Sequence, residues 1–279
     1  MRHVAGPRGD LNALAGDDDG IRVCRDGAVG VIALHRGGQH NALTAAMGRR
    51  LLDAVVRAAA DPSVRCLLLV GEDGSFCAGD DLHGVQAWNG GKPGEAPFDP
   101  LTHDAYYLRI CESLIQAPKP VVAGLTGVTA GAGLDIACAA DYRVAGEQAR
   151  FASRLINVGH VGHAVLLPRI IGVGRATNWY LTGRLVGARE AFSAGFLDEV
   201  VPDDEVHTRA TRLARELACA PTASIGLFKD LRERAWGQPV QAGLRLQDAC
   251  HLVTHDQVRD ASRGIEAAAD GHRADFQGD

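Results

Sequence analysis

Two short, continuously apolar runs, each followed by a glycine-rich turn, constrain the fold more than any other feature of this sequence. Residues 66–70 (CLLLV) precede a turn over residues 71–82, and residues 121–125 (VVAGL) precede a turn over 127–133. Short apolar runs bounded by turn residues are typical of strands buried on both faces. The second turn leads into an expected helix over residues 134–140. The sequence therefore predicts an α/β fold.

Other segments extend this pattern along the chain. Thr44 can cap a helix that ends near Ala60, because Asp61-Pro62 follows. The β-branched residues on both sides of Asp26-Gly27 indicate a hairpin. The expected elements are hairpin strands over 21–25 and 28–35, a helix over 104–115, strands over 142–145 and 198–201, and helices only from residue 205 onward.

The chain divides into three expected regions. Residues 1–20 carry no long apolar stretch and read as a flexible N-terminal extension. Residues 21–205 hold all the expected strands and form the predicted α/β core, and residues 206–279 form a helical C-terminal region. Residues 89–100 contain three glycines and three prolines, so we expect a mobile surface loop there.

The charge, apolar runs and cysteines of the chain limit which partners and which compartment are expected. The 279 residues include 34 acidic and 29 basic side chains, a formal net charge of −5, so nucleic acid is not expected as a partner. No apolar run approaches the roughly 18 residues of a membrane span, and we expect no membrane partner. The seven cysteines form no CxxC pair, which favours free thiols and a cytoplasmic protein.

The two glycine-rich turns also have chemical potential. Small residues in both turns can leave backbone N–H groups unpaired, and the second turn places them at the positive end of a helix dipole. Two such N–H groups that converge on one point would hold a carbonyl oxygen as it becomes an oxyanion. On these residues alone, two ordinary strand-to-helix turns remain an equal alternative.

Several further motifs, in a fixed order along the chain, favour the interpretation that the two turns hold an oxyanion. Residues 41–43 (NAL), 76–82 (FCAGDDL), 124–143, 182–184, 188–202 and 263–275 match, in order, motifs of one family. The sequence thus resembles the enoyl-CoA hydratase/isomerase, or crotonase, family over residues 21–279. The resemblance implies a spiral of ββα units and a helical C-terminal trimerisation region. It also implies a homotrimer or a dimer of trimers (a homohexamer).

The resemblance further implies an acyl-CoA thioester substrate and no cofactor, since coenzyme A is part of the substrate. The thioester oxygen would accept hydrogen bonds from the amides of Asp80 and Ala132. Many family members have glycine where Ala132 stands, but a backbone donor tolerates the added methyl group.

The catalytic side chains depart from the family pattern. Hydratases use two glutamates, and the matching positions here are Asp135 and Leu155. A leucine cannot transfer a proton, whereas His163, eight residues further on, can do so near neutral pH. We therefore predict Asp135 and His163 as the acid/base pair. The alternatives are that His163 and His160 are structural and that Asp135 caps its own helix.

The remaining candidates concern substrate binding. The segments that bind CoA in the family correspond here to Arg36, His40, Ala42, Ala78, Gly79, Asp80 and Leu82, with Leu155 and His160 as further substrate-binding candidates. The aromatic residues of the stretch 85–107 could line the acyl pocket: Trp88, Phe98, Tyr106 and Tyr107. His251 and His255 have the spacing of a zinc helix but no evident third ligand, so no metal site is predicted.

The predicted function is therefore that of an enoyl-CoA hydratase or double-bond isomerase that works through an enolate, with a place in fatty-acid metabolism. Two alternatives stay open. The loss of a glutamate at Leu155 fits a non-catalytic acyl-CoA binder. A homologue that cleaves C–C bonds or decarboxylates its substrate would depend mainly on the oxyanion hole.

Overall fold

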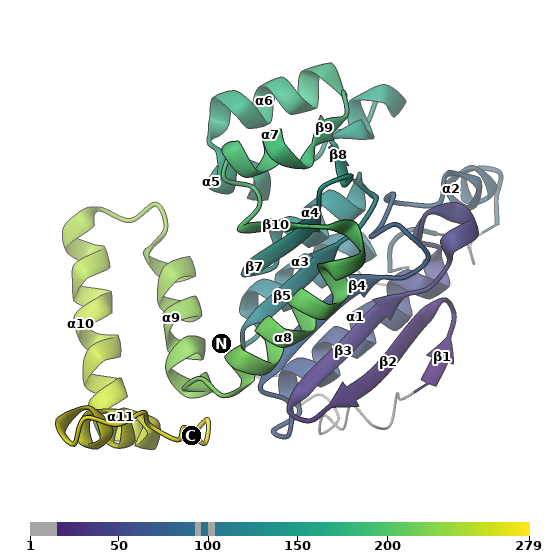
Figure 1. The fold of residues 1–279 in the computed structure, drawn as a ribbon. Helices are drawn as coiled ribbons and strands as arrows, with labels where there is room; N and C mark the ends of the chain where they lie inside the picture. The colour runs from purple at the N-terminus through teal and green to yellow at the C-terminus, as the bar shows by residue number, and fades with distance from the viewer. Residues whose placement is uncertain (1–15, 93–95, 100–103) are drawn as a thin grey trace.

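The computed structural model describes residues 16–92, 96–99 and 104–279, so residues 1–15 of the expected extension lie outside the described part, as does some of the expected surface loop. The central element is a seven-stranded sheet in the order β1-β2-β3-β4-β5-β7-β10 (Figure 1). The strands are β1 (Gly16–Asp18), β2 (Ile21–Asp26), β3 (Val29–Leu34), β4 (Cys66–Gly71), β5 (Val121–Leu125), β7 (Tyr142–Gly146) and β10 (Glu199–Val201).

The pairing of these strands follows the sequence pattern. β2 and β3 form the expected antiparallel hairpin, and every pair from β3 to β10 is parallel. All six residues of β4 and all five of β5 are buried, as expected for strands covered on both faces. β1 pairs with β2, so regular structure begins inside the range expected to be a flexible extension.

Helices cover both faces of the sheet. α1 (Ala45–Ala60), α3 (Tyr106–Gln116) and α4 (Ala132–Cys138) lie on one face, and α8 (Val206–Ala218) lies on the other (Figure 1). Successive side chains of β4 point to opposite faces of the sheet. Leu67 and Leu69 pack in the core with α1, α3 and α4, while Leu68 packs in the core with α8. Thr44 caps α1 as predicted, because its Oγ1 accepts a hydrogen bond from Met47 N at 3.1 Å.

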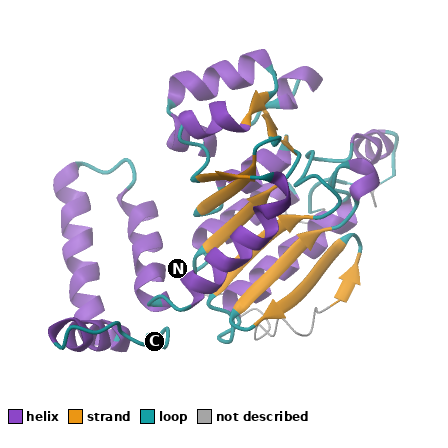
Figure 2. Cartoon of the chain, viewed as in Figure 1, coloured by secondary structure: helices purple, strands orange, loops and turns teal. Residues whose placement is uncertain are grey.

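A smaller sheet in the order β6-β8-β9 lies beyond the end of β5 (Figure 2). Its strands are β6 (Val128–Ala130), β8 (Arg150–Ala152) and β9 (Val186–Gly187), and the helices around it are α5 (Leu166–Ile171), α6 (Val173–Thr182) and α7 (Ala188–Ser193). β6 occupies part of the predicted turn 127–133. Its three residues were too few to show a strand period, and pairing with β8 makes the strand.

The helix α2 (Leu82–Asn89) was not expected from sequence, because this short segment contains a glycine and has no clear apolar stripe. Asp81 begins α2, because its Oδ1 accepts a hydrogen bond from His83 N at 3.0 Å. The short 3-10 helices are η2 (Gly37–Gln39), η4 (Arg154–Val158) and η5 (Asp203–Glu205).

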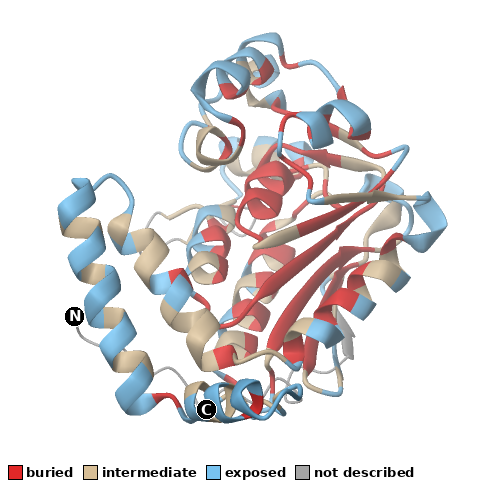
Figure 3. Cartoon of the chain, turned by 60° about the vertical axis from the view of Figure 1, so that its left-hand side comes forward, coloured by how far each residue is buried: buried red, intermediate tan, exposed pale blue. Residues whose placement is uncertain are grey.

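The C-terminal helices extend away from the sheet. They are α9 (Thr222–Ala235), α10 (Val240–Gln257) and α11 (Arg259–Ala269), and Figure 3 shows how little of α10 is buried. Lys229 anchors α9: its buried Nζ lies 2.5 Å from Asp141 Oδ2 and donates to Leu114 O and Lys119 O. Among the described residues, no helix is both long and apolar enough to span a membrane.

Candidate active site

A cavity of about 980 Å³ opens beyond the carboxyl ends of β4 and β5, where ligands bind in many α/β proteins. The two glycine-rich turns, α2, and the segment around η4 form its walls. The lining residues used below are Ala42, Ala78, Gly79, Asp80, Leu82, Tyr107, Ala130, Gly131, Leu155 and His160.

Backbone hydrogen bonds fix the first turn, and none of those named below uses the N–H of Asp80. Leu43 N donates to Gly79 O at 2.7 Å, and Asp81 N donates to Leu43 O at 2.9 Å. Ala78 N donates to His40 O at 3.0 Å. Within the part of the chain that the structure describes, the N–H of Asp80 has no acceptor, and Asp80 lines the cavity.

The second turn is joined to the first by strand-like pairing. Cys77 N donates to Val128 O at 3.1 Å, and Ala130 N donates to Cys77 O at 2.9 Å. Ala132 is the first residue of α4, where an N–H has no partner inside the helix. No acceptor for Ala132 N lies among residues 16–92, 96–99 and 104–279. The second free amide therefore stands at the positive end of a helix dipole.

The two turns meet backbone to backbone at Gly79. Its φ is +100°, and a Cβ added there would lie 3.1 Å from both Ala130 O and Ala132 N. Any side chain would push against the atoms that hold the second turn in place. Gly79 therefore sets the spacing between the amides of Asp80 and Ala132.

His163 lies directly behind the second turn. Its ring is fully buried, with Nδ1 2.6 Å from Ser153 Oγ and Nε2 2.9 Å from Gly131 O. A carbonyl oxygen only accepts, so Nε2 carries a proton. His163 also has a φ of +55°, a left-handed conformation uncommon for histidine, which these contacts stabilise.

Asp135 is the neighbour of this ring. Its Oδ2 lies 3.7 Å from His163 Nε2, and its side chain is 6% exposed. Burial raises the pKa of Asp135, and the nearby His163 opposes that rise. The pair predicted from sequence is thus adjacent, but neither residue is among those that line the cavity.

Tyr107 connects Asp135 with the cavity. Burial, together with the charges of Asp135 and Asp80, raises the pKa of Tyr107 to about 12. Tyr107 lines the cavity, and Asp135 is close enough for its charge to affect the phenol. Tyr107 belongs to the aromatic stretch that the sequence analysis proposed for the acyl pocket.

The substrate-binding candidates divide into two groups. Seven of them line the cavity, namely Ala42, Ala78, Gly79, Asp80, Leu82, Leu155 and His160. Arg36 and His40 are not among the lining residues. Arg36 Nη2 lies 2.7 Å from Asp81 Oδ2, and Arg36 Nη1 donates to Ala42 O, while His40 Nδ1 lies 3.0 Å from Ser75 Oγ.

From sequence, only the backbone amide of Asp80 was expected to contribute to the site, and its carboxyl was not. That side chain belongs to a half-buried residue of the cavity wall, and burial raises the pKa of Asp80 to about 6. The sequence does place two consecutive aspartates at residues 80–81, which could have indicated a carboxyl in the site. The sequence alone could not show which of the two carboxyls is available. In the fold, Asp81 pairs with Arg36 and caps α2, whereas Asp80 lines the cavity.

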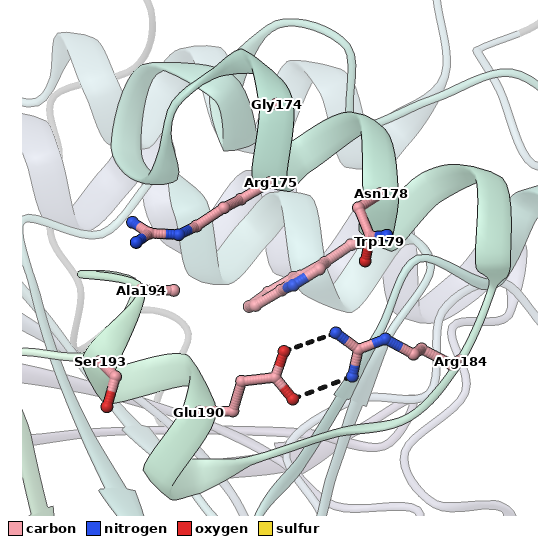
Figure 4. A pocket seen from close by; sticks show the side chains of 8 residues that line it. All are labelled: Gly174, Arg175, Asn178, Trp179, Arg184, Glu190, Ser193 and Ala194. Atoms are coloured by element: carbon pink, nitrogen blue, oxygen red, sulfur yellow. Dashed lines mark hydrogen bonds and ion pairs between the residues drawn. The ribbon is translucent and has the colours of Figure 1, made fainter.

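A second pocket, of about 370 Å³, lies between α6 and α7 (Figure 4). Arg184 and Glu190 face each other there in two hydrogen bonds, and the buried Trp179 forms the floor. The charged groups of this pair neutralise each other, and the pocket is remote from both glycine-rich turns. It adds nothing to the candidate active site.

Comparison with known proteins agrees with this geometry. A family model described as "Enoyl-CoA hydratase/isomerase" matches residues 25–278. The 1,2-epoxyphenylacetyl-CoA isomerase of Escherichia coli (strain K12) is 33% identical over 71% of this chain and 76% of its own. The 4-chlorobenzoyl coenzyme A dehalogenase-2 of an Arthrobacter species is 33% identical over 76% of this chain and 77% of its own.

The solved structures give the same result. The enoyl-CoA hydratase from Mycobacterium tuberculosis H37Rv has a TM-score of 0.82 and 25% identity, over 94% of this chain and 100% of its own. The chain belongs to the enoyl-CoA hydratase/isomerase family and has the α/β crotonase fold with C-terminal helices. It is an acyl-CoA enzyme of the hydratase or isomerase type, which confirms the family and fold predicted from sequence.

The contact at Gly79 gives a first prediction. Replacing Gly79 with alanine should lower the free energy of unfolding by more than the same change at Gly74, measured by urea denaturation. Both glycines have positive φ, which costs alanine about 1–2 kcal/mol, but an added Cβ at Gly74 meets nothing within 4 Å. Equal losses in the two variants would show that the turns are not in close contact at Gly79.

Proposed function

We propose that this enzyme binds an acyl-CoA thioester with its carbonyl oxygen between the amides of Asp80 and Ala132 and stabilises an enolate there. The observation that carries the proposal is that two joined turns each leave one N–H with no acceptor among the described residues, Asp80 N in the cavity wall and Ala132 N beside Gly79. Such donors act most strongly on the charge that develops in the transition state. The reaction would be enoyl-CoA hydration or double-bond isomerisation.

The surroundings of the two amides support enolate chemistry. Ala132 N stands at the start of α4, whose dipole favours negative charge at that end. The cavity wall is apolar at Leu155 and at several of its neighbours, and low polarity strengthens hydrogen bonds to an oxyanion. Removal of one such donor typically costs about 3 kcal/mol of transition-state stabilisation.

We assign proton transfer to Asp135, with His163 as its partner. Burial raises the pKa of Asp135, so this side chain can act as a carboxylic acid closer to neutral pH. His163 is enclosed, and its proton on Nε2 lies toward both Gly131 O and Asp135. In this proposal Asp135 is the proton-transfer group, and His163, whose Nε2 lies 3.7 Å from Asp135 Oδ2, positions it.

Three assays on the purified protein test the proposal. Loss of the enone absorbance of crotonyl-CoA reports hydration, its appearance from a 3-enoyl-CoA reports isomerisation, and release of free CoA or carbon dioxide reports C–C cleavage or decarboxylation. The proposal expects one of the first two. Tight binding of several acyl-CoAs with no turnover would instead identify a non-catalytic binder.

Ala132 allows the oxyanion hole to be tested directly. Ala132→Pro removes the N–H, and the first position of a helix tolerates proline. Turnover of the active substrate should fall by about a hundredfold or more. Ala132→Gly keeps the N–H and should retain most of the turnover that proline abolishes. Equal activity of both variants would contradict the assignment of this amide.

The acid/base assignment gives a separate prediction. Asp135→Asn and His163→Ala should each lower kcat strongly, by about a hundredfold for Asp135→Asn, while the affinity for a saturated acyl-CoA changes little. The measurements are steady-state kinetics and calorimetric binding. Unchanged kcat in both variants would remove the assignment.

We also propose that the chain forms a homotrimer or a dimer of trimers through its C-terminal helices. α10 has no buried residue, and large apolar side chains are exposed on α9, α10 and α11, namely Phe228, Val240, Leu244, Leu252 and Ile265. Exposed apolar faces of this kind mark association surfaces. Sedimentation velocity of the full chain should show a trimer or a hexamer, and a monomer at micromolar concentration would contradict the proposal.

A further inference from the structure

Asp80 and Asp81 are neighbours in sequence but have different surroundings. Asp81 is buried, pairs with Arg36 and caps α2. The Asp80 carboxyl lines the cavity and makes no hydrogen bond or ion pair with any residue the structure describes. A structural role therefore accounts for Asp81 and leaves Asp80 unexplained.

The groups that face Asp80 come from three parts of the fold. Cys77 lies in the same turn, Tyr107 on α3 and His160 in the loop after η4, and each is close enough to interact electrostatically with Asp80. Burial raises the pKa of Asp80 to about 6, and His160 opposes that rise. The carboxyl is therefore ionised at neutral pH yet basic enough to take a proton.

The cavity that Asp80 lines also contains an apolar substitution. Leu155, at the position where the family resemblance places a second glutamate, lines the same cavity and offers no proton-transfer group. The charges of Asp80 and Asp135 both raise the pKa of Tyr107, so both carboxyls lie within electrostatic range of the same phenol. The site thus holds two carboxyls, one of which comes from the turn that supplies the first amide.

We propose that the Asp80 side chain is a catalytic base of this enzyme and takes the place of the carboxyl lost at Leu155. Its backbone N–H holds the thioester oxygen, so its carboxylate is fixed close to carbon 2 of the same substrate. This inference rests on the proposed function, because it needs an enolate in the oxyanion hole.

The step can be written for a 3-enoyl thioester. The Asp80 carboxylate accepts a proton from carbon 2, and the electron pair of that C–H bond moves into the thioester to give an enolate between the two amides. The enolate then takes a proton at carbon 4 from the Asp135 carboxylic acid, and the double bond shifts to carbons 2 and 3. Asp80 leaves the step protonated and Asp135 ionised, and exchange with water restores both.

Asp80→Asn tests the carboxyl alone, because the variant keeps the backbone amide and nearly the same shape. The probe is deuterium incorporation at carbon 2 of a saturated acyl-CoA, such as butyryl-CoA, in deuterated water, followed by NMR. We expect the exchange rate to fall by about a hundredfold or more, with binding of butyryl-CoA little changed. Asp80→Glu should restore part of the exchange.

Two further measurements sharpen the test. The wild-type exchange rate should rise with pH through an apparent pKa near 6, because the base must be ionised, and this limb should vanish in Asp80→Asn. Asp135→Asn should keep exchange at carbon 2 while it loses isomerisation. The matched control is Asp53→Asn on α1, whose carboxyl pairs with Arg57 far from the cavity and should leave the exchange rate unchanged.

The outcomes distinguish a failure of the proposed function from a failure of the role assigned to Asp80. If the wild type neither exchanges carbon 2 protons nor turns over any acyl-CoA, the proposed function fails and Asp80 has no catalytic role. If the wild type exchanges and Asp80→Asn does so at the same rate, only the role of Asp80 is overturned. A fall that Asp53→Asn shares would reflect damage to the fold and would also contradict the assignment.

Discussion

The backbone pairing between the two glycine-rich turns determines the rest of the candidate site. Cys77 exchanges hydrogen bonds with Val128 and Ala130 as neighbouring strands do, and this pairing holds the ends of β4 and β5 together beyond the main sheet. Among the described residues, the amides of Asp80 and Ala132 are left without an acceptor beside this pairing. The oxyanion hole proposed for this enzyme is thus a consequence of where strand pairing stops.

Much of this arrangement could be predicted from the amino-acid sequence. The buried strands β4 and β5 appeared as short apolar runs, Thr44 marked the start of α1, and ordered motifs indicated the family. These features depend on local pattern, which a single sequence displays. β6 and α2 could not be predicted, since three residues show no period and the segment of α2 contains a glycine and no clear apolar stripe.

The surroundings of the titratable side chains required the folded structure. His163 was expected at the substrate, but its position behind Gly131 depends on a partner at Ser153 and on a left-handed backbone that the sequence does not signal. Asp80 and Asp81 look equivalent in sequence, and only the path of Arg36 distinguishes them. The motif thus located the turn but could not identify which carboxyl remains available.

The hydrogen bond from His163 to Gly131 O has an effect on the opposite side of the same peptide group. Gly131 C=O and Ala132 N–H belong to one amide plane, and in a trans peptide they point in opposite directions. A donor on the oxygen draws electron density away from the nitrogen, so the N–H becomes a stronger donor than an isolated amide. The imidazole would thereby polarise the proposed oxyanion hole through the peptide bond between Gly131 and Ala132, without itself lining the cavity.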